Sequence, residues 1–223
     1  VYDGTSVASS SDLTITNNLD GSNLTLTGSG LLSLEDVGTR TISVPASVLP
    51  SRVQAATGST GANASNTCTV TLSSAPTDGN TLIAIISTRN TTANTVSSIT
   101  QTGTTWTRAT QSTNANGNTV EIWYAQAKTT SGAGVTVTLN QVSVRTSAVV
   151  MEYSGVLALN PLDVVSSATG NSTAASTGSI TTTQANELLI GGVGFINSGY
   201  TLGSLTNSFT QVATVATTNG TAS

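Results

Sequence analysis

Residues 119–127, with the sequence TVEIWYAQA, decide the fold class. Side chains alternate between the two faces of a strand, so Val120, Ile122 and Tyr124 share one face of this stretch. The other face carries Glu121 and Trp123, which places bulky groups on both sides. The pattern predicts a central β-strand that is buried on both faces near Trp123.

Turn signals and alternating patterns extend this prediction along the chain. Asn116-Gly117, just before the central stretch, is typical of a β-hairpin turn, and Asp20-Gly21 and Asp78-Gly79 are further turn signals. No stretch has a convincing helical period. Strands are predicted at residues 12–16, 23–27, 31–34, 41–44, 68–72, 81–88, 96–101, 105–109, 119–127, 135–140, 145–153, 187–195 and 208–216. The predicted fold is all-β: an antiparallel β-sandwich or a jelly roll.

Composition divides the chain into three parts. Residues 1–50 predict a β-rich N-terminal arm or small domain with two similar stretches, SDLTITNN and SNLTLTGSG. Small polar residues without periodicity predict a linker at 51–66, followed by the β-sandwich domain at 67–223. Because a few short strands cannot close a core alone, the arm needs a partner, either the main domain or another subunit. The final stretch ATTNGTAS is turn-like, which leaves open that the sandwich lacks C-terminal strands.

The charged and reactive residues exclude several classes of function. Charged residues make up 7% of the 223 residues, the net charge is −4, and there is no histidine. The six basic residues are scattered singly, so no cationic face for nucleic acid is expected. No apolar run reaches the length of a membrane-spanning helix. We predict no catalytic residues, cofactor or metal site, and the single cysteine, Cys68, is predicted to be a buried apolar residue.

Three minor alternatives remain open at this point. Glu121 and Glu152 lie in long predicted strands and would suit a glycosidase if their carboxylates faced each other. Lys128 would suit an intramolecular amide bond to an asparagine beside a buried carboxylate. Acidic loop oxygens near Asp78 or Asp163 would suit calcium, although no repeated ligand spacing is present.

Aromatic residues and glycosylation motifs provide the candidate site residues. Trp106 and Trp123 are candidate stacking platforms for a glycan, although core packing is the more common role of a tryptophan. Asn-x-Ser/Thr motifs make five asparagines candidate glycosylation sites, and several such matches arise by chance in a Ser/Thr-rich chain. These are Asn23, Asn63, Asn90, Asn171 and Asn219.

Seven motifs carry a resemblance to a known family. In chain order they are SSAPTDGNTLIAIIST, SSITQTGTTWTRATQS, VEIWYAQA, SAVVMEYSGV, PLDVVSSATG, TTTQANELLIGGVGF and SFTQVAT. Their order, over about residues 66–217, resembles a β-sandwich domain that recurs in secreted, cell-surface and virion structural proteins. The first 50 residues resemble repetitive surface-fibre sequence. The resemblance implies an extracellular or virion-surface location, identifies no catalytic residues, and implies one or two further strands after the position of Ser223.

These observations lead to one expected function and one alternative. We expect a non-enzymatic structural subunit whose copies assemble through inter-subunit β-strand pairing, because low charge and hydroxylated strands suit surfaces packed against copies of themselves. The assembly would be a surface filament, such as a pilus-like fibre, or a virion decoration or fibre. The alternative is a glycan-binding adhesin or carbohydrate-binding module.

Overall fold

The computed structural model describes residues 7–9, 29–31, 49–90, 95–142, 144–158, 160–184, 187–195, 203–217 and 221–222. Within these ranges the chain forms strands, turns and irregular segments, and no helix. It divides into two units, Val1–Val48 and Leu49–Ser223. In the first unit, β1 (Val7–Ser9) pairs with β2 (Ser29–Leu31) in antiparallel orientation. The predicted strands at 12–16, 23–27 and 41–44, most of 31–34, and the turn at Asp20-Gly21 lie outside the described residues.

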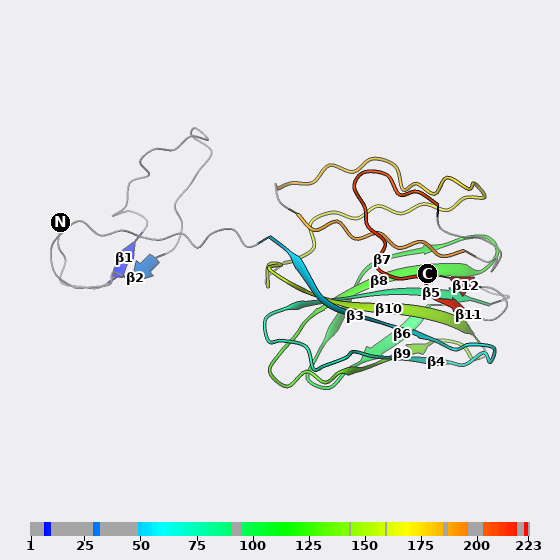
Figure 1. Cartoon of the computed structure of the whole chain (residues 1–223), viewed down its shortest axis with the longest axis horizontal. Coiled ribbons are helices and arrows are strands. Elements are labelled where there is room, and N and C mark those ends of the chain that lie inside the picture. The colour runs from blue at the N-terminus through cyan, green and yellow to red at the C-terminus, as the bar shows by residue number, and fades with distance from the viewer. Residues whose placement is uncertain are drawn as a thin grey trace. The chain divides into compact units, whose positions relative to one another are not determined.

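The second unit is built on two antiparallel sheets (Figure 1). The five-stranded sheet has the order β3 (Ser51–Ser59), β10 (Arg145–Ser154), β5 (Thr81–Arg89), β8 (Asn118–Gln126) and β7 (Trp106–Thr113). The three-stranded sheet has the order β4 (Thr67–Thr71), β9 (Gly134–Leu139) and β6 (Val96–Thr100). The predicted all-β fold with an antiparallel β-sandwich is confirmed.

The main core lies between the two sheets. In β4, Cys68 and Val70 are buried while the threonines between them are exposed, as expected for a strand with one face toward the core. The facing side of the five-stranded sheet contributes Leu82 and Ile86 of β5 and Val150 of β10, all fully buried. Each such side chain contributes about 1.5–3 kcal/mol to folding.

A second apolar cluster covers the opposite face of the five-stranded sheet. Here Ile85 of β5 and Met151 of β10 pack against Leu188, Ile190 and Val215 of the C-terminal part of the chain. Figure 1 shows that part, coloured yellow to red, running across the sheet. Because β5 and β10 bury both faces, their sequences read as continuous apolar runs. The strand predicted at 119–127 forms as β8, between β5 and β7, but it is only half-buried from Ile122 to Tyr124, so the expected burial of both faces near Trp123 is not found.

Residues 51–59, predicted as part of a linker, form the edge strand β3, and the linker prediction is wrong over this range. The strand pairs with β10 in antiparallel orientation, with Thr57 opposite Val149 and a register shift between Glu152 and Tyr153. Its alternate residues Gln54, Ala56 and Gly58 are half-buried. A Cβ on Gly58 would come within 2.3 Å of the Thr69 carbonyl oxygen, so small residues are required where β3 meets β4. Such small side chains give only a weak alternating signal.

Two other predicted strands are wrong. Residues 187–194 and 209–215 are irregular, and Phe195 forms an isolated β-bridge. Ala216 begins the two-residue strand β11 (Ala216–Thr217), which pairs with β12 (Thr221–Ala222). The alternating apolar residues at 188 and 190 are used for packing on the sheet face and not for a paired strand. The remaining strands predicted between 68 and 153 are confirmed, with β7 extending four residues further than expected. The hairpin turn at Asn116-Gly117 is confirmed, with a φ of 74° at Gly117.

Candidate functional site

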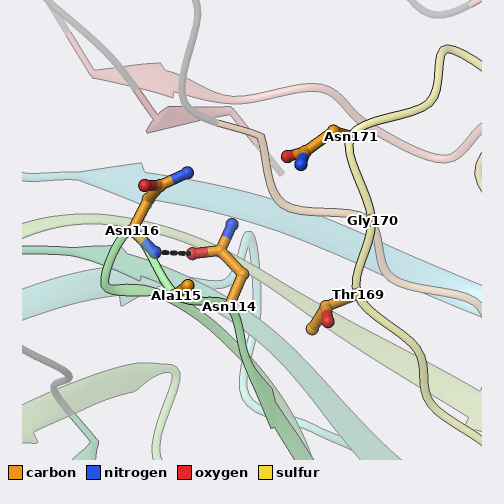
Figure 2. A pocket seen from close by; sticks show the side chains of 6 residues that line it. All are labelled: Asn114, Ala115, Asn116, Thr169, Gly170 and Asn171. Atoms are coloured by element: carbon orange, nitrogen blue, oxygen red, sulfur yellow. Dashed lines mark hydrogen bonds between the residues drawn. The ribbon is translucent and has the colours of Figure 1, made fainter.

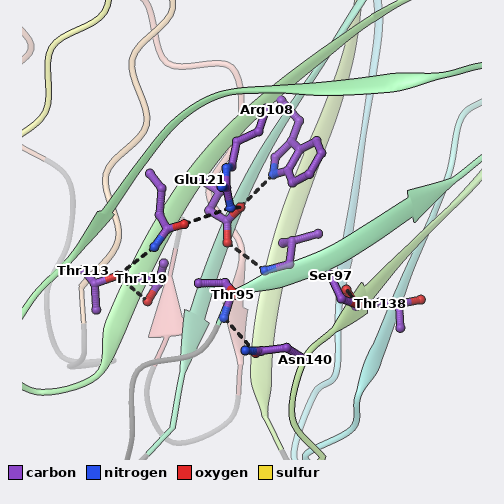
Figure 3. A network of polar contacts seen from close by, with 11 residues as sticks. Thr95, Ser97, Arg108, Thr113, Thr119, Glu121, Thr138 and Asn140 are labelled. Atoms are coloured by element: carbon purple, nitrogen blue, oxygen red, sulfur yellow. Dashed lines mark hydrogen bonds and ion pairs between the residues drawn. The ribbon is translucent and has the colours of Figure 1, made fainter.

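Glu121 places a buried carboxylate between the two sheets (Figure 3). Its side chain is 1% exposed. Oε1 accepts a hydrogen bond from the main-chain nitrogen of Val96 at 2.7 Å, and Oε2 accepts one from Trp123 Nε1 at 2.9 Å. A guanidinium nitrogen of Arg108 lies 3.5 Å from Oε2. These three partners occupy both carboxylate oxygens and give the buried charge a structural role.

Glu152 is a second buried carboxylate and is fully enclosed. Oε1 accepts hydrogen bonds from the Thr77 main-chain nitrogen at 2.8 Å and from Asn80 Nδ2 at 2.6 Å, and Oε2 accepts one from Gln54 Nε2 at 2.5 Å. Burial acts to raise the pKa of Glu152, but the donors from Gln54, Asn80 and Thr77 outweigh it and lower the pKa below its ordinary value. The carboxylate stays charged and ties edge strand β3 to the loop before β5.

The two carboxylates do not form a catalytic pair. Glu121 lies opposite Ile86 of β5, whereas Glu152 lies opposite Leu82 of the same strand. Four residues along a strand span about 13 Å, before the two intervening strand spacings are added. A glycosidase pair requires a separation of about 5 to 10 Å. The register therefore contradicts the glycosidase alternative.

The tryptophans do not form an exposed platform. Trp106 is buried, 8% exposed, and its Nε1 donates to Gln101 Oε1 at 3.1 Å, so the platform prediction is wrong for this residue. Trp123 is half-buried and packs against the main core. The Arg108 guanidinium lies 5.7 Å from the centre of its ring, which gives this aromatic face a cation as its neighbour. Core packing is the main role of both side chains.

Lys128 and Cys68 are located in opposite environments. The Lys128 side chain is exposed, and no polar contact of its ammonium group is found within the described part of the chain. The proposed amide bond to an asparagine near a buried carboxylate therefore gains no support: Asn80, which contacts Glu152, donates its amide to that carboxylate instead. Cys68 is a buried free thiol, as predicted, and burial raises its pKa to about 11.

The acidic loop residues do not gather into a cation site. Asp78 is exposed in the turn before β5. Asp163 accepts hydrogen bonds from the main-chain nitrogen and the hydroxyl of Thr183, at 2.8 and 2.6 Å, which lower its pKa. Burial and the neighbouring Asp163 raise the pKa of Glu187. Among the described residues no group of three or more His, Cys, Asp or Glu side chains is placed to hold a metal ion.

The glycosylation motifs differ in accessibility. Asn63 and Asn171 are exposed, whereas Asn90 is half-buried and its Nδ2 donates to Gln141 Oε1 at 3.0 Å. Asn23 and Asn219 lie outside the described residues. An exposed asparagine in an irregular segment is the more accessible acceptor, so Asn63 and Asn171 are the candidates that the fold leaves open.

A small polar pocket is a feature that the sequence patterns did not indicate. The β7–β8 turn at 114–116 and the loop at 169–171 line an open pocket of about 250 Å³ (Figure 2). These segments are more than fifty residues apart in sequence, and no motif links them. The one sequence signal that falls in the pocket is the turn motif Asn116-Gly117, which lies in one of its two walls.

Comparisons with known proteins identify no relative: no protein-family model, curated protein or solved structure matches this chain. A search of the described residues also finds no helix that is both long and apolar enough to span a membrane.

Proposed function

We propose that this protein is a non-enzymatic structural subunit of an extracellular assembly, a surface filament or a virion decoration or fibre, whose copies are joined by inter-subunit β-strand pairing. The observation that carries the proposal is the outer layer, defined here as residues 156–217, which covers the outer face of the five-stranded sheet. This layer has the properties of a surface that another chain would cover.

The outer layer exposes apolar side chains. Among the described residues, eight of the eleven exposed large hydrophobic side chains belong to it. They are Leu157, Leu162, Val165, Ile180, Leu189, Val193, Leu205 and Phe209. Scattered apolar residues are common on protein surfaces, but their concentration in one layer indicates an interaction surface.

In the described part of the outer layer, most main-chain groups are not hydrogen-bonded to one another. Among the described residues between 156 and 194, no hydrogen bond joins two main-chain groups. Peptide groups require hydrogen-bond partners wherever water is excluded. A layer that packs as irregular chain and carries apolar side chains is therefore suited to accept an added strand.

Charge favours the outer layer over the sheet edge as the acceptor. The layer contains two charged residues, Asp163 and Glu187, and no basic one. The exposed edge strand β7 instead has a register shift between Arg108 and Thr110 and carries the Arg108 charge. Bulges and charges on an edge strand oppose pairing with another chain. An uncharged, hydroxyl-rich strand fits the outer layer better.

The N-terminal arm of a neighbouring copy is the proposed donor. Its stretches SDLTITNN and SNLTLTGSG alternate apolar and hydroxyl side chains and carry one acidic residue between them. Such a strand offers apolar groups to one face and main-chain groups to an unpaired neighbour. The proposal joins the arm of one copy to the outer layer of the next.

Sedimentation velocity and negative-stain electron microscopy of the full chain test this proposal. We expect concentration-dependent oligomers or filaments. Deletion of residues 1–45 should yield a folded monomer, and the arm added as a separate peptide should bind that monomer. A truncated chain that assembles as the full chain does would refute the proposal.

A charge placed in the outer layer gives a sharper test. Val193→Lys should prevent assembly without unfolding the sandwich, because Val193 is 46% exposed and is not part of the apolar cluster on the sheet face. Val142→Lys is the matched control, since Val142 is 72% exposed and lies in the β9–β10 connection. Equal assembly of both variants would exclude the outer layer as the interface.

A further inference from the structure

The polar pocket between the β7–β8 turn and the 169–171 loop has one wall fixed by the hairpin and a second wall that follows a contact with β7. On one side, Asn114 closes the hairpin: its main-chain nitrogen donates to the Asn118 carbonyl at 2.9 Å, and its carbonyl accepts from Gly117 at 3.1 Å. On the other side, the Ser112 hydroxyl contacts the Ala168 carbonyl at 3.5 Å, which joins the loop to β7. The pocket thus belongs to the folded sandwich, and its walls do not depend on the first unit.

The lining is entirely neutral and rich in amides. The residues that line the pocket are Asn114, Ala115, Asn116, Thr169, Gly170 and Asn171. An amide side chain supplies two donor hydrogens and an accepting oxygen, and a hydroxyl can both donate and accept. A ligand that matches this lining should carry many groups that both donate and accept hydrogen bonds, and it does not need to be charged.

Most of this hydrogen-bonding capacity is free. Asn114 Oδ1 accepts from the main-chain nitrogens of Asn116 and Asn118, at 2.9 and 3.0 Å, which fixes its side chain and leaves its Nδ2 hydrogens. Within the part of the chain that the structure describes, no partner is found for the side chains of Asn116, Thr169 and Asn171. In Figure 2 the three amide side chains come from opposite walls of the pocket.

The size of the pocket limits the ligand. A volume of about 250 Å³ holds roughly eight water molecules at about 30 Å³ each. This is below the roughly 300–1,000 Å³ of sites for drug-sized ligands. One sugar ring or a small polyol fits, and a buried oligosaccharide does not.

From these observations we propose that the pocket binds a neutral polyhydroxyl ligand, a single sugar residue, through the amides of Asn114, Asn116 and Asn171. One wall of the site, residues 169–171, belongs to the outer layer, but none of the exposed apolar side chains of that layer lines the pocket, so the proposed sugar binding does not require self-assembly. It places sugar recognition at the end of the sandwich and not on the tryptophans. Because no aromatic ring lines the pocket to stack against the sugar, the expected dissociation constant is in the millimolar range, about 1–10 mM.

The test is a titration of the full, unglycosylated chain with glucose, galactose, mannose and N-acetylglucosamine, followed by backbone amide shifts in NMR. At least one sugar should give saturable shifts at residues 114–116 and 169–171. Asn116→Ala and Asn171→Ala should each weaken binding about fivefold or more, and Asn63→Ala, an exposed asparagine in another turn, should not. Inorganic phosphate and Ca²⁺ should give no saturable shift at these residues.

Three results would overturn the proposal. The first is the absence of saturable shifts with every sugar, and the second is unchanged binding in both pocket variants. The third is saturable binding of phosphate or calcium at the pocket in place of a sugar. Amide spectra of the variants that match the wild-type spectrum elsewhere will show that each variant is folded.

Discussion

Glu121 Oε1 lies 2.7 Å from the main-chain nitrogen of Val96, so a side chain of the five-stranded sheet hydrogen-bonds the first residue of β6 in the other sheet. A carboxylate that accepts from a buried peptide nitrogen forms a charge-assisted hydrogen bond, which is stronger than a neutral one. This contact joins the two halves of the sandwich by a directed interaction, in addition to the apolar core.

Glu121→Ala should therefore destabilise the fold much more than Arg108→Ala. Loss of the carboxylate leaves the Val96 amide without its partner, at a cost of about 2–3 kcal/mol. The Arg108 side chain is 44% exposed, so its ion pair with Glu121 contributes about 1 kcal/mol or less. Urea unfolding of the two variants measures both values. Equal losses would show that the ion pair, and not the link to β6, is the important contact.

Glu152 should make stability depend on acid pH. Its folded pKa is below the ordinary value of 4.5, so its contribution is complete above that value and is lost as the pH falls through the folded pKa. The Glu152 contribution to the free energy of unfolding should therefore stay constant from neutral pH to about pH 4.5 and decrease as the pH falls further. Glu152→Gln should be less stable at neutral pH and show a shallower decrease.

Gln54→Ala serves as the intermediate case for the same experiment. It removes one of the donors that lower the Glu152 pKa and keeps Asn80 and Thr77. Its pH dependence should fall between those of the wild type and Glu152→Gln. If all three profiles have the same slope, the hydrogen bonds to Glu152 do not set the acid sensitivity.

Cys68 should be inert in the folded protein. The thiolate is the reactive form, and a buried thiol with a pKa of about 11 is almost entirely neutral at pH 8. Intact-mass measurement after iodoacetamide treatment should show no adduct in buffer and one adduct in urea. Rapid alkylation in buffer would mean that β4 opens readily.

Gly194→Ala should loosen the outer layer. A Cβ at this position would lie 2.5 Å from both Ser87 Oγ and Val120 Cγ2, so the segment must lift from the sheet, at a cost of about 1–3 kcal/mol. Limited proteolysis should cut residues 187–195 faster in this variant. Gly203→Ala is the control, because nothing lies within 4 Å of its added Cβ. Equal protease sensitivity would contradict the close packing of residue 194.

The strands of the main core could be predicted because each carries its own signal. β4, β5, β8, β9 and β10 contain bulky apolar residues at regular positions, and Gly117 marks the one short turn between β7 and β8. β3 could not be recognised in this way. Its buried positions hold Gln54, Ala56 and Gly58, small or polar residues whose place in the sheet depends on the approach of β4.

The candidate sites depended even more on distant contacts. The sequence drew attention to Glu121, Glu152 and the two tryptophans, but it did not reveal that donors would surround each carboxylate or that Trp106 would be buried. The pocket formed by Asn114, Asn116 and Asn171 had no sequence signal as a unit. Hydrogen bonds between residues far apart in sequence, such as the one between Gln54 and Glu152, 98 residues apart, are determined only by the packing of the sheets.

By itself, the amino-acid sequence determined the β-strand character, the absence of histidine chemistry and the low charge of the surface, because these follow from residue type and local alternation. The tertiary structure alone decided which strand became the edge, which carboxylates were enclosed, and that residues 187–194 pack as an irregular layer instead of a strand. A strand requires a neighbour to hydrogen-bond, and whether one is present is a property of the whole fold.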